Sequence, residues 1–324
     1  MPDGFIQDPA ERLFALLDRE EPRIANIFRV LVLQMRDEID LDELANLIES
    51  GRQDEAIERL QHIAERLGSE VNVSFVTAGQ STAEFMTNAG VGRVVFNQVN
   101  PFAVAAMQAT RLTLVREFTD EQRRATSLAL VSGVEAGANP RAQARDFRDS
   151  IGLTERQWAA VARYRSSLER VGLDPEAAQD ALRRQLRDRR GDAQVLRAAR
   201  EGQRLTPEKI DWLISRYTSK YIKHRSEVIG RTEALRAVHE GNEEMYRQAI
   251  ADGTIDPEKL VRTWETRVDG RERHTHLLLN GQKRPWGEPW VTQNGVIRYP
   301  GDPEAAAEET IQCRCAIGTR IRQR

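Results

Sequence analysis

Apolar residues fall at helical spacing through most of roughly the first 250 positions. In the first such stretch they recur three or four residues apart, the period of one helix face: Leu13, Leu16, Leu17, Ile24, Ile27 and Phe28. Asp8 is a suitable cap, because Pro9 follows in the first turn and Glu11 completes a capping box. The pattern therefore predicts a helix that begins directly after Asp8.

Further helix starts follow along the chain. Residues 41–48 and 56–67 carry helical patterns separated by Gly51. Later starts carry a cap before a proline or a capping-box sequence: Asn100-Pro101, Asn139-Pro140, Thr119 to Gln122 and Thr154 to Gln157. One stretch departs from the pattern, because Val71 to Gln80 alternates in the manner of a strand or a loop.

Two long polar segments precede the C-terminal part. Asp174-Pro175 begins a very polar helical pattern that includes the arginine-rich run Arg183 to Arg190. Thr206-Pro207 then begins the longest helical pattern of the chain, which continues to about Ala251. We expect this long helix to act as a spine against which other elements pack.

The character of the sequence changes at about Asp252-Gly253, after which glycine and proline become frequent. Short β-type runs occur at Leu260 to Thr266 and at Gly295 to Tyr299. We therefore predict a mainly α protein with a small α+β C-terminal module. Its expected parts are a helical body (1–205), a long connecting helix (206–252) and the module (253–324).

Charge and composition narrow the possible partners. The net charge is −2, so the whole molecule is not drawn to DNA or to anionic lipid. No stretch approaches the roughly 18–20 apolar residues of a membrane span, and the N-terminus lacks the order of a signal peptide. The only cysteines, Cys313 and Cys315, are poorly spaced for a strain-free disulfide, which indicates synthesis in a reducing cytoplasm.

Arginine accounts for nearly all of the positive charge, since only five of the 48 basic residues are lysines. A GC-rich genome explains this bias, whereas contact with DNA is an alternative because Arg binds phosphate through two hydrogen bonds. Candidate DNA contacts lie in the arginine-rich run and in the basic tail: Arg183, Arg184, Arg187, Arg320, Arg322 and Arg324. We otherwise expect the run to be a solvated helix face, in which Asp180, Asp188 and Asp192 dilute the positive charge.

A set of motifs follows in fixed order from Trp264. After Trp264 comes Asp269, with Arg273 four residues and His276 seven residues further on. The dipeptide Asn280-Gly281 follows. The set ends with a Tyr-Pro-Gly-Asp-Pro turn, Tyr299 to Pro303, and a Gln-Cys-Arg-Cys sequence, Gln312 to Cys315. Arg271 occupies a further basic position. This order resembles the C-terminal domain of the phage Mu F-like head-morphogenesis (minor capsid) family. With looser upstream matches from Ile151 and Gly230, the resemblance covers about residues 120–318.

The resemblance implies a structural virion component made in the host cytoplasm and incorporated in several copies during capsid assembly. Such a protein is expected to associate with the portal inside the head, beside packaged DNA, and to assist DNA packaging or ejection. The site residues are then expected to hold the module together as a structural network: Trp264, Asp269, Arg271, Arg273, His276, Tyr299, Asp302, Cys313, Arg314 and Cys315.

The spacing of Asp269, Arg273 and His276 predicts one shared helix face, on which the Asp and the Arg form an ion pair. Cys313 and Cys315 would point to one side of a strand. Two thiolates with imidazoles from His274 and His276 would also form a tetrahedral zinc site. We expect the metal-free network and retain zinc as the alternative.

The same residue types allow enzymatic alternatives. Cys315 with His276 as its base would form a nucleophile pair, and a zinc–His–Asp set would hydrolyse peptidoglycan or a phosphodiester. The chain carries no nucleophile elbow, HExxH or Walker loop. We therefore expect no enzyme, with a virion-borne nuclease or peptidoglycan-type hydrolase as the alternative.

Overall fold

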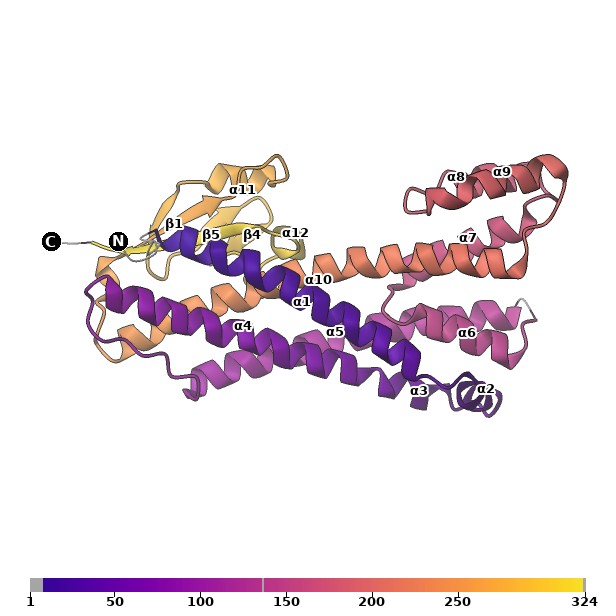
Figure 1. Cartoon of the computed structure of the whole chain (residues 1–324). Helices are drawn as coiled ribbons and strands as arrows, with labels where there is room; N and C mark the ends of the chain where they lie inside the picture. The colour runs from indigo at the N-terminus through magenta and orange to yellow at the C-terminus, as the bar shows by residue number, and fades with distance from the viewer. Residues whose placement is uncertain (1–7, 136, 323–324) are drawn as a thin grey trace, which may run out of the picture. The chain divides into compact units, whose positions relative to one another are not determined.

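The computed structural model describes residues 8–135 and 137–322 and has the predicted mainly α architecture with a small C-terminal β module (Figure 1). The helices are α1 (Pro9–Glu38), α2 (Leu41–Glu49), α3 (Gln53–Arg59), α4 (Gln61–Asn88), α5 (Pro101–Glu135), α6 (Pro140–Ser150), α7 (Glu155–Arg170), α8 (Ala177–Leu182), α9 (Asp192–Glu201), α10 (Pro207–Ala251), α11 (His274–Leu279) and α12 (Ala307–Thr310). The short 3-10 helices are η1 (Arg189–Gly191) and η2 (Pro257–Lys259).

Several predicted helix starts are confirmed. Asp8 Oδ1 accepts hydrogen bonds from the backbone N–H groups of the first turn of α1. Asn139 caps α6 in front of Pro140, and Thr154 forms a complete capping box at the start of α7. The longest predicted helix is α10, with its bounds as expected.

Three local predictions are wrong. Residues 71–80 lie inside α4 and not in a strand or a loop. Thr119 to Gln122 lies inside α5, where a continuous helix needs no new cap. The polar helix after Asp174 is interrupted, because residues 183–188 form turns between α8 and η1 before α9 begins.

The molecule consists of two compact units, each assembled from separate parts of the chain. Within the described residues, one unit consists of 8–28, 65–114 and 226–322, and the other of 29–64 and 115–225 without residue 136. The first unit contains the whole C-terminal module. The module therefore shares its core with parts of α1, α4 and α10.

The module contains a three-stranded antiparallel sheet with the order β2-β1-β5 and a separate β3–β4 hairpin. The strands are β1 (Leu260–Thr266), β2 (Lys283–Pro285), β3 (Trp290–Thr292), β4 (Gly295–Ile297) and β5 (Cys315–Ile321). The predicted strand at Leu260 to Thr266 is confirmed as β1, which pairs along its full length with β5, from Leu260 opposite Ile321 to Thr266 opposite Cys315.

Helix α10 covers the free edge of β5 through side chains. His239 Nε2 lies 3.2 Å from the carbonyl oxygen of Cys315, and the Tyr246 hydroxyl donates to the carbonyl of Thr319 over 3.3 Å. These contacts satisfy polar backbone atoms that an edge strand otherwise exposes. The sheet is thereby joined to α10.

One core cluster joins the module to the long helices. It contains apolar residues of α1, α4 and α10 and, from the module, residues of β1, α11, β3, β4, β5 and two loops: Ala10, Leu13, Leu16, Leu17, Ala78, Leu235, Val238, Trp264, Leu279, Trp290, Ile297, Tyr299, Cys313, Cys315, Ala316 and Ile317. Burial of this shared surface is the main force that holds the module in place.

Candidate metal centre

Trp264 stands at the centre of the module. It lies on β1, is fully buried, and meets the ring of His276 edge-on at a centroid distance of 5.2 Å. Its other neighbour is Trp290, at 5.4 Å. β1 is the central strand, and its buried side chains contact the other site residues. Trp264 contacts His276, and the Thr266 hydroxyl lies 3.6 Å from Cys315 Sγ.

His276 and the two cysteines lie close together beside β1. His276 Nδ1 lies 3.4 Å from Cys313 Sγ and 3.4 Å from Cys315 Sγ. The three residues are only 1%, 1% and 3% exposed. The prediction grouped these side chains correctly, although Cys313 precedes β5 and only Cys315 lies on the strand.

The backbone before β5 has a conformation that brings both sulfurs to the same place. Gln312 adopts a left-handed conformation with φ of 59°, which is uncommon for a residue other than glycine. Its backbone N–H donates to Thr232 Oγ1 over 3.2 Å, and its side-chain oxygen accepts from Arg231 over 3.1 Å. These bonds to α10 hold the turn that places Cys313 next to Cys315.

The second ring nitrogen of His276 faces a carboxylate. His276 Nε2 lies 2.8 Å from Glu309 Oε2, and both side chains are 2% exposed. Glu309 accepts hydrogen bonds from Thr275 Oγ1 over 3.0 Å and from Asn294 Nδ2 over 2.8 Å. Burial acts to raise the pKa of Glu309, but hydrogen bonds from Thr292, Asn294 and Thr275 and the nearby imidazole hold it below its ordinary value.

The two thiols differ in their acidity. Burial and the neighbouring Cys315 raise the pKa of Cys313 well above its ordinary value. The hydrogen bond from Cys313, and further the contact with His276, hold the pKa of Cys315 well below its ordinary value despite burial. The pair is therefore arranged so that Cys315 carries a sulfur anion first.

The metal-ligand atoms of His276, Cys313 and Cys315 all lie within 4.8 Å of one another. Two sulfurs and one imidazole nitrogen are the donor types that zinc prefers. The structure thus contains a candidate metal site with these three residues. His274, the fourth predicted ligand, is exposed at the start of α11 and is not part of this group.

The predicted shared helix face of Asp269, Arg273 and His276 is wrong. Asp269 and Arg273 precede α11, and the intervening Gly270 has a φ of +82° that interrupts any helix. Asp269 instead forms a two-oxygen ion pair with Arg314, across 45 residues of sequence.

The other basic residues of the predicted network have separate contacts. Arg273 donates to the backbone carbonyl of Ile311, and Arg271 is exposed with its backbone N–H bound to Asp269 Oδ1. The Asp269–Arg314 and Arg273 contacts join the loop before α11 to the segment that carries the cysteines. They lie outside the candidate metal site and hold the segment that carries two of its residues.

The Tyr-Pro-Gly-Asp-Pro turn contacts α10. Asp302 binds Arg298 through both carboxylate oxygens and caps the backbone N–H of Glu304. Gly301 has a φ of +83° and lies so close to Arg236 of α10 that a Cβ would be 3.1 Å from its backbone nitrogen. The Tyr299 hydroxyl donates to Glu240. The turn therefore holds the module against α10.

The candidate DNA contacts are dispersed. Arg187 is paired with Asp192 by two hydrogen bonds of 3.0 and 2.9 Å, and Arg320 is paired with Asp8. The Arg183 side chain is 75% exposed and lies 3.7 Å from Asp180. Arg184 is half-buried, Arg322 is exposed, and Arg324 lies outside the described residues.

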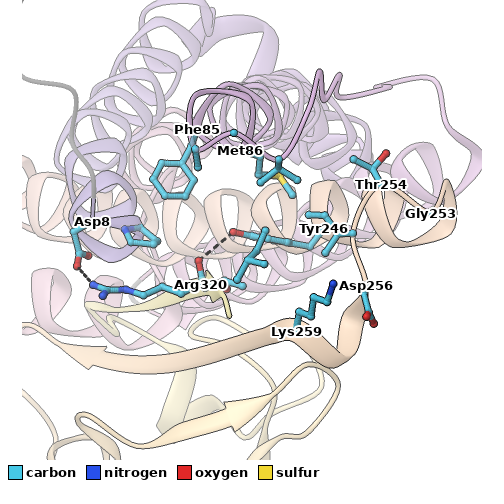
Figure 2. A pocket seen from close by; sticks show the side chains of 16 residues that line it. Asp8, Phe85, Met86, Tyr246, Gly253, Thr254, Asp256, Lys259 and Arg320 are labelled. Atoms are coloured by element: carbon cyan, nitrogen blue, oxygen red, sulfur yellow. Dashed lines mark hydrogen bonds and ion pairs between the residues drawn. The ribbon is translucent and has the colours of Figure 1, made fainter. Parts of the chain in front are cut away.

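A groove of about 840 Å³ lies near the start of α1 (Figure 2). Phe85 and Met86 of α4 form an apolar side, and Tyr246 points into it while donating to the carbonyl of Thr319. The Asp8–Arg320 ion pair closes one edge. The described lining contains neither cysteine nor histidine, so the groove shares no residue with the candidate metal site.

Several important residues carried no signal in the sequence. Glu309, Glu243 and Arg262 are buried charges, and His239 is a fully buried histidine on α10. Charged residues are common in this chain and nothing in their spacing marks these ones. His239 is the exception, because the chain has only five histidines and the apolar pattern around this one indicates that it faces the core.

Comparisons with known proteins return no relative: no family model, no curated protein and no solved structure matches this chain. Among the described residues, no helix has both the length and the apolar character needed to span a membrane.

Proposed function

We propose that this protein is a minor head (head-morphogenesis) protein of a phage, a structural component of the virion rather than an enzyme. The proposal rests on the Mu F-like order of motifs from Trp264 to Cys315. One structural observation supports it most. The motif side chains Trp264, His276 and Tyr299, like both cysteines, are buried inside the module.

This burial favours a structural protein that acts by binding other proteins over an enzyme with a reactive site. A hydrolytic centre needs a reactive group that substrate can reach, whereas the thiols and the imidazole are at most 3% exposed. The proposed role is to bind the portal protein and other head or connector proteins in the capsid interior, in several copies. From there it would assist DNA packaging or ejection, with contact to packaged DNA.

The test is the amount of the chain in purified particles and its binding to the portal. Quantitative mass spectrometry of virions is expected to find several copies per particle, and tagged portal is expected to retain the chain from assembling cells. A variant that destabilises the module, Trp264→Ala, is expected to lose incorporation, whereas Trp212→Ala on α10, where the indole is 37% exposed, retains it. Absence of the wild-type chain from virions would overturn the proposal.

We further propose Zn²⁺ as the ion of the candidate metal site. Zinc–sulfur and zinc–nitrogen bonds of about 2.3 and 2.0–2.1 Å place tetrahedral sulfur and nitrogen ligands roughly 3.6 Å apart. The two sulfur–nitrogen distances of 3.4 Å are close to that separation. The burial of all three ligands supports a structural role for the ion over a hydrolytic one. Metal analysis of purified protein tests this: about one zinc per chain is expected, and none in Cys313→Ser/Cys315→Ser.

A further inference from the structure

We propose that Glu309 is the outer carboxylate of the zinc site, which fixes the tautomer and orientation of His276 and thereby sets the affinity for the ion. The inference rests on the zinc binding proposed above and adds a positioning residue to it. The two ring nitrogens of His276 face different groups.

His276 Nδ1 is the nitrogen that faces both sulfurs. A histidine that binds a metal offers an unprotonated nitrogen, so the ring proton must then reside on the other nitrogen. That nitrogen, Nε2, lies 2.8 Å from Glu309 Oε2. A carboxylate at this position stabilises the tautomer that leaves Nδ1 free to bind the ion.

Glu309 is itself held by groups on other parts of the module. Thr275 Oγ1, one residue before His276 on α11, donates to Oε2 over 3.0 Å. Asn294 Nδ2, in the turn of the β3–β4 hairpin, donates to Oε1 over 2.8 Å. Because the Glu309 residue is 1% exposed, water does not compete for these bonds. The carboxylate is therefore fixed before an ion binds.

The neighbouring Glu308 provides a matched control. It lies beside Glu309 on α12 but is exposed. A Glu-to-Gln change at either position removes one negative charge from the same short helix, and only the change at Glu309 replaces the carboxylate that faces His276 Nε2 with a neutral amide. A general electrostatic effect would alter both variants, whereas the proposed role alters one.

The experiment is a competition titration of the metal-free full-length chain with Zn²⁺ against a chromophoric chelator. Wild type and Glu308→Gln are expected to bind about one zinc with equal affinity. Glu309→Gln is expected to bind about ten- to a hundred-fold more weakly, the usual effect of removing an outer-shell partner. With Co²⁺ as the probe, the thiolate-to-cobalt absorption should persist in Glu309→Gln, because both sulfurs remain.

The outcomes separate the two proposals. If wild type binds no zinc, the metal proposal is wrong. If wild type binds zinc and Glu309→Gln matches Glu308→Gln, zinc stands and the role of Glu309 is refuted. Should Glu309→Gln fail to fold by circular dichroism, Thr275→Val decides the matter. It removes only one bond to the carboxylate, and it is expected to weaken zinc binding several-fold, with an unchanged affinity counting against Glu309.

Discussion

At the scale of single residues, a buried charge pair joins strand β1 of the module to α10. Arg262 and Glu243 lie 2.9 Å apart with side chains only 3% and 7% exposed. The Arg262 guanidinium also donates to the carbonyl of Arg298 over 2.7 Å and lies over the rings of Trp286 and Trp290. Each charge removed from water is therefore offset by its partner and by directed contacts.

Removal of one member of this pair should be strongly destabilising. Arg262→Met leaves Glu243 buried without its counter-charge, and we expect a loss of about 3–5 kcal/mol in the free energy of unfolding at pH 7. Urea denaturation monitored by tryptophan fluorescence measures the loss. The double variant Arg262→Met/Glu243→Leu should recover much of it, and a double variant as unstable as the single one would contradict this explanation.

Asp146 on α6 should make stability depend on pH. Burial raises its pKa to about 6, against an ordinary value of 3.8. The folded state therefore holds this proton more tightly than the unfolded chain, and its advantage is lost as pH rises from about 4 through 6. Asp146→Asn should increase the free energy of unfolding by about 2–3 kcal/mol at pH 7 and leave it nearly unchanged at pH 3. Urea unfolding at both values measures this, with the exposed Glu58→Gln as control; an equal effect at both pH values would be evidence against it.

Residues of rare type could be identified from the sequence, whereas common ones could not. Two cysteines and a histidine near a tryptophan were grouped correctly because few such residues exist in the chain. Glu309 was missed because it is one of 50 acidic residues and its role depends on a contact with a ring 33 positions away. The Asp269–Arg273 pairing was wrong because helical spacing has meaning only where a helix exists.

At the scale of elements, the amphipathic patterns predicted the long helices well but failed where local preference and burial disagree. Val71, Val73 and Val76 favour a strand by type, because β-branched side chains lose rotamer freedom in a helix. The buried positions Val71, Phe75 and Ala78 are spaced by three and four residues, and packing on that face outweighs the intrinsic preference.

The close approach of α4 and α10 should be sensitive to a single methyl group. A Cβ on Gly241 would lie 2.1 Å from the carbonyl oxygen of Phe75 on α4, so the helices must separate. We expect Gly241→Ala to lower the free energy of unfolding by about 1–3 kcal/mol, the usual effect of overpacking. Thermal and urea denaturation measure the change.

Gly68→Ala on α4 is the matched control. There the new Cβ would lie 2.9 Å from Cγ of Arg111, which a change of rotamer can move, and no backbone atom comes closer than the Arg111 Cα at 3.6 Å. Alanine also favours a helix over glycine by about 1 kcal/mol, so this variant should lose less stability than Gly241→Ala. If both variants behave alike, helix propensity and not the helix–helix distance would be the cause.

At the scale of the whole molecule, composition predicted where the module begins but not what completes its core. Glycine and proline mark the change in character after Asp252. The compact unit that contains the module also includes 8–28 and 65–114, because α1 and α4 supply apolar residues to the same core. A pattern along one segment contains no information about which distant segment packs on it.

Zinc removal should lower the thermal stability of the chain if the ion binds as proposed. An ion that binds only the folded state adds about 2.7 kcal/mol at a free concentration of one hundred times its Kd. Calorimetry is therefore expected to show a melting temperature several degrees higher with zinc than after chelation. Cys313→Ser/Cys315→Ser should show no such difference. A wild-type melting temperature that does not respond to zinc would argue against the ion.

The position of α1 in this core also has a consequence for synthesis. Leu13, Leu16 and Leu17 pack with Cys313 and Ile317, and Asp8 pairs with Arg320, 312 residues away. At about 5–20 residues per second, a ribosome needs roughly a quarter of a minute to a minute to make that much chain. During that interval the apolar face of the nascent helix lacks its final partners. We therefore expect the nascent chain to bind a ribosome-associated chaperone through this apolar face.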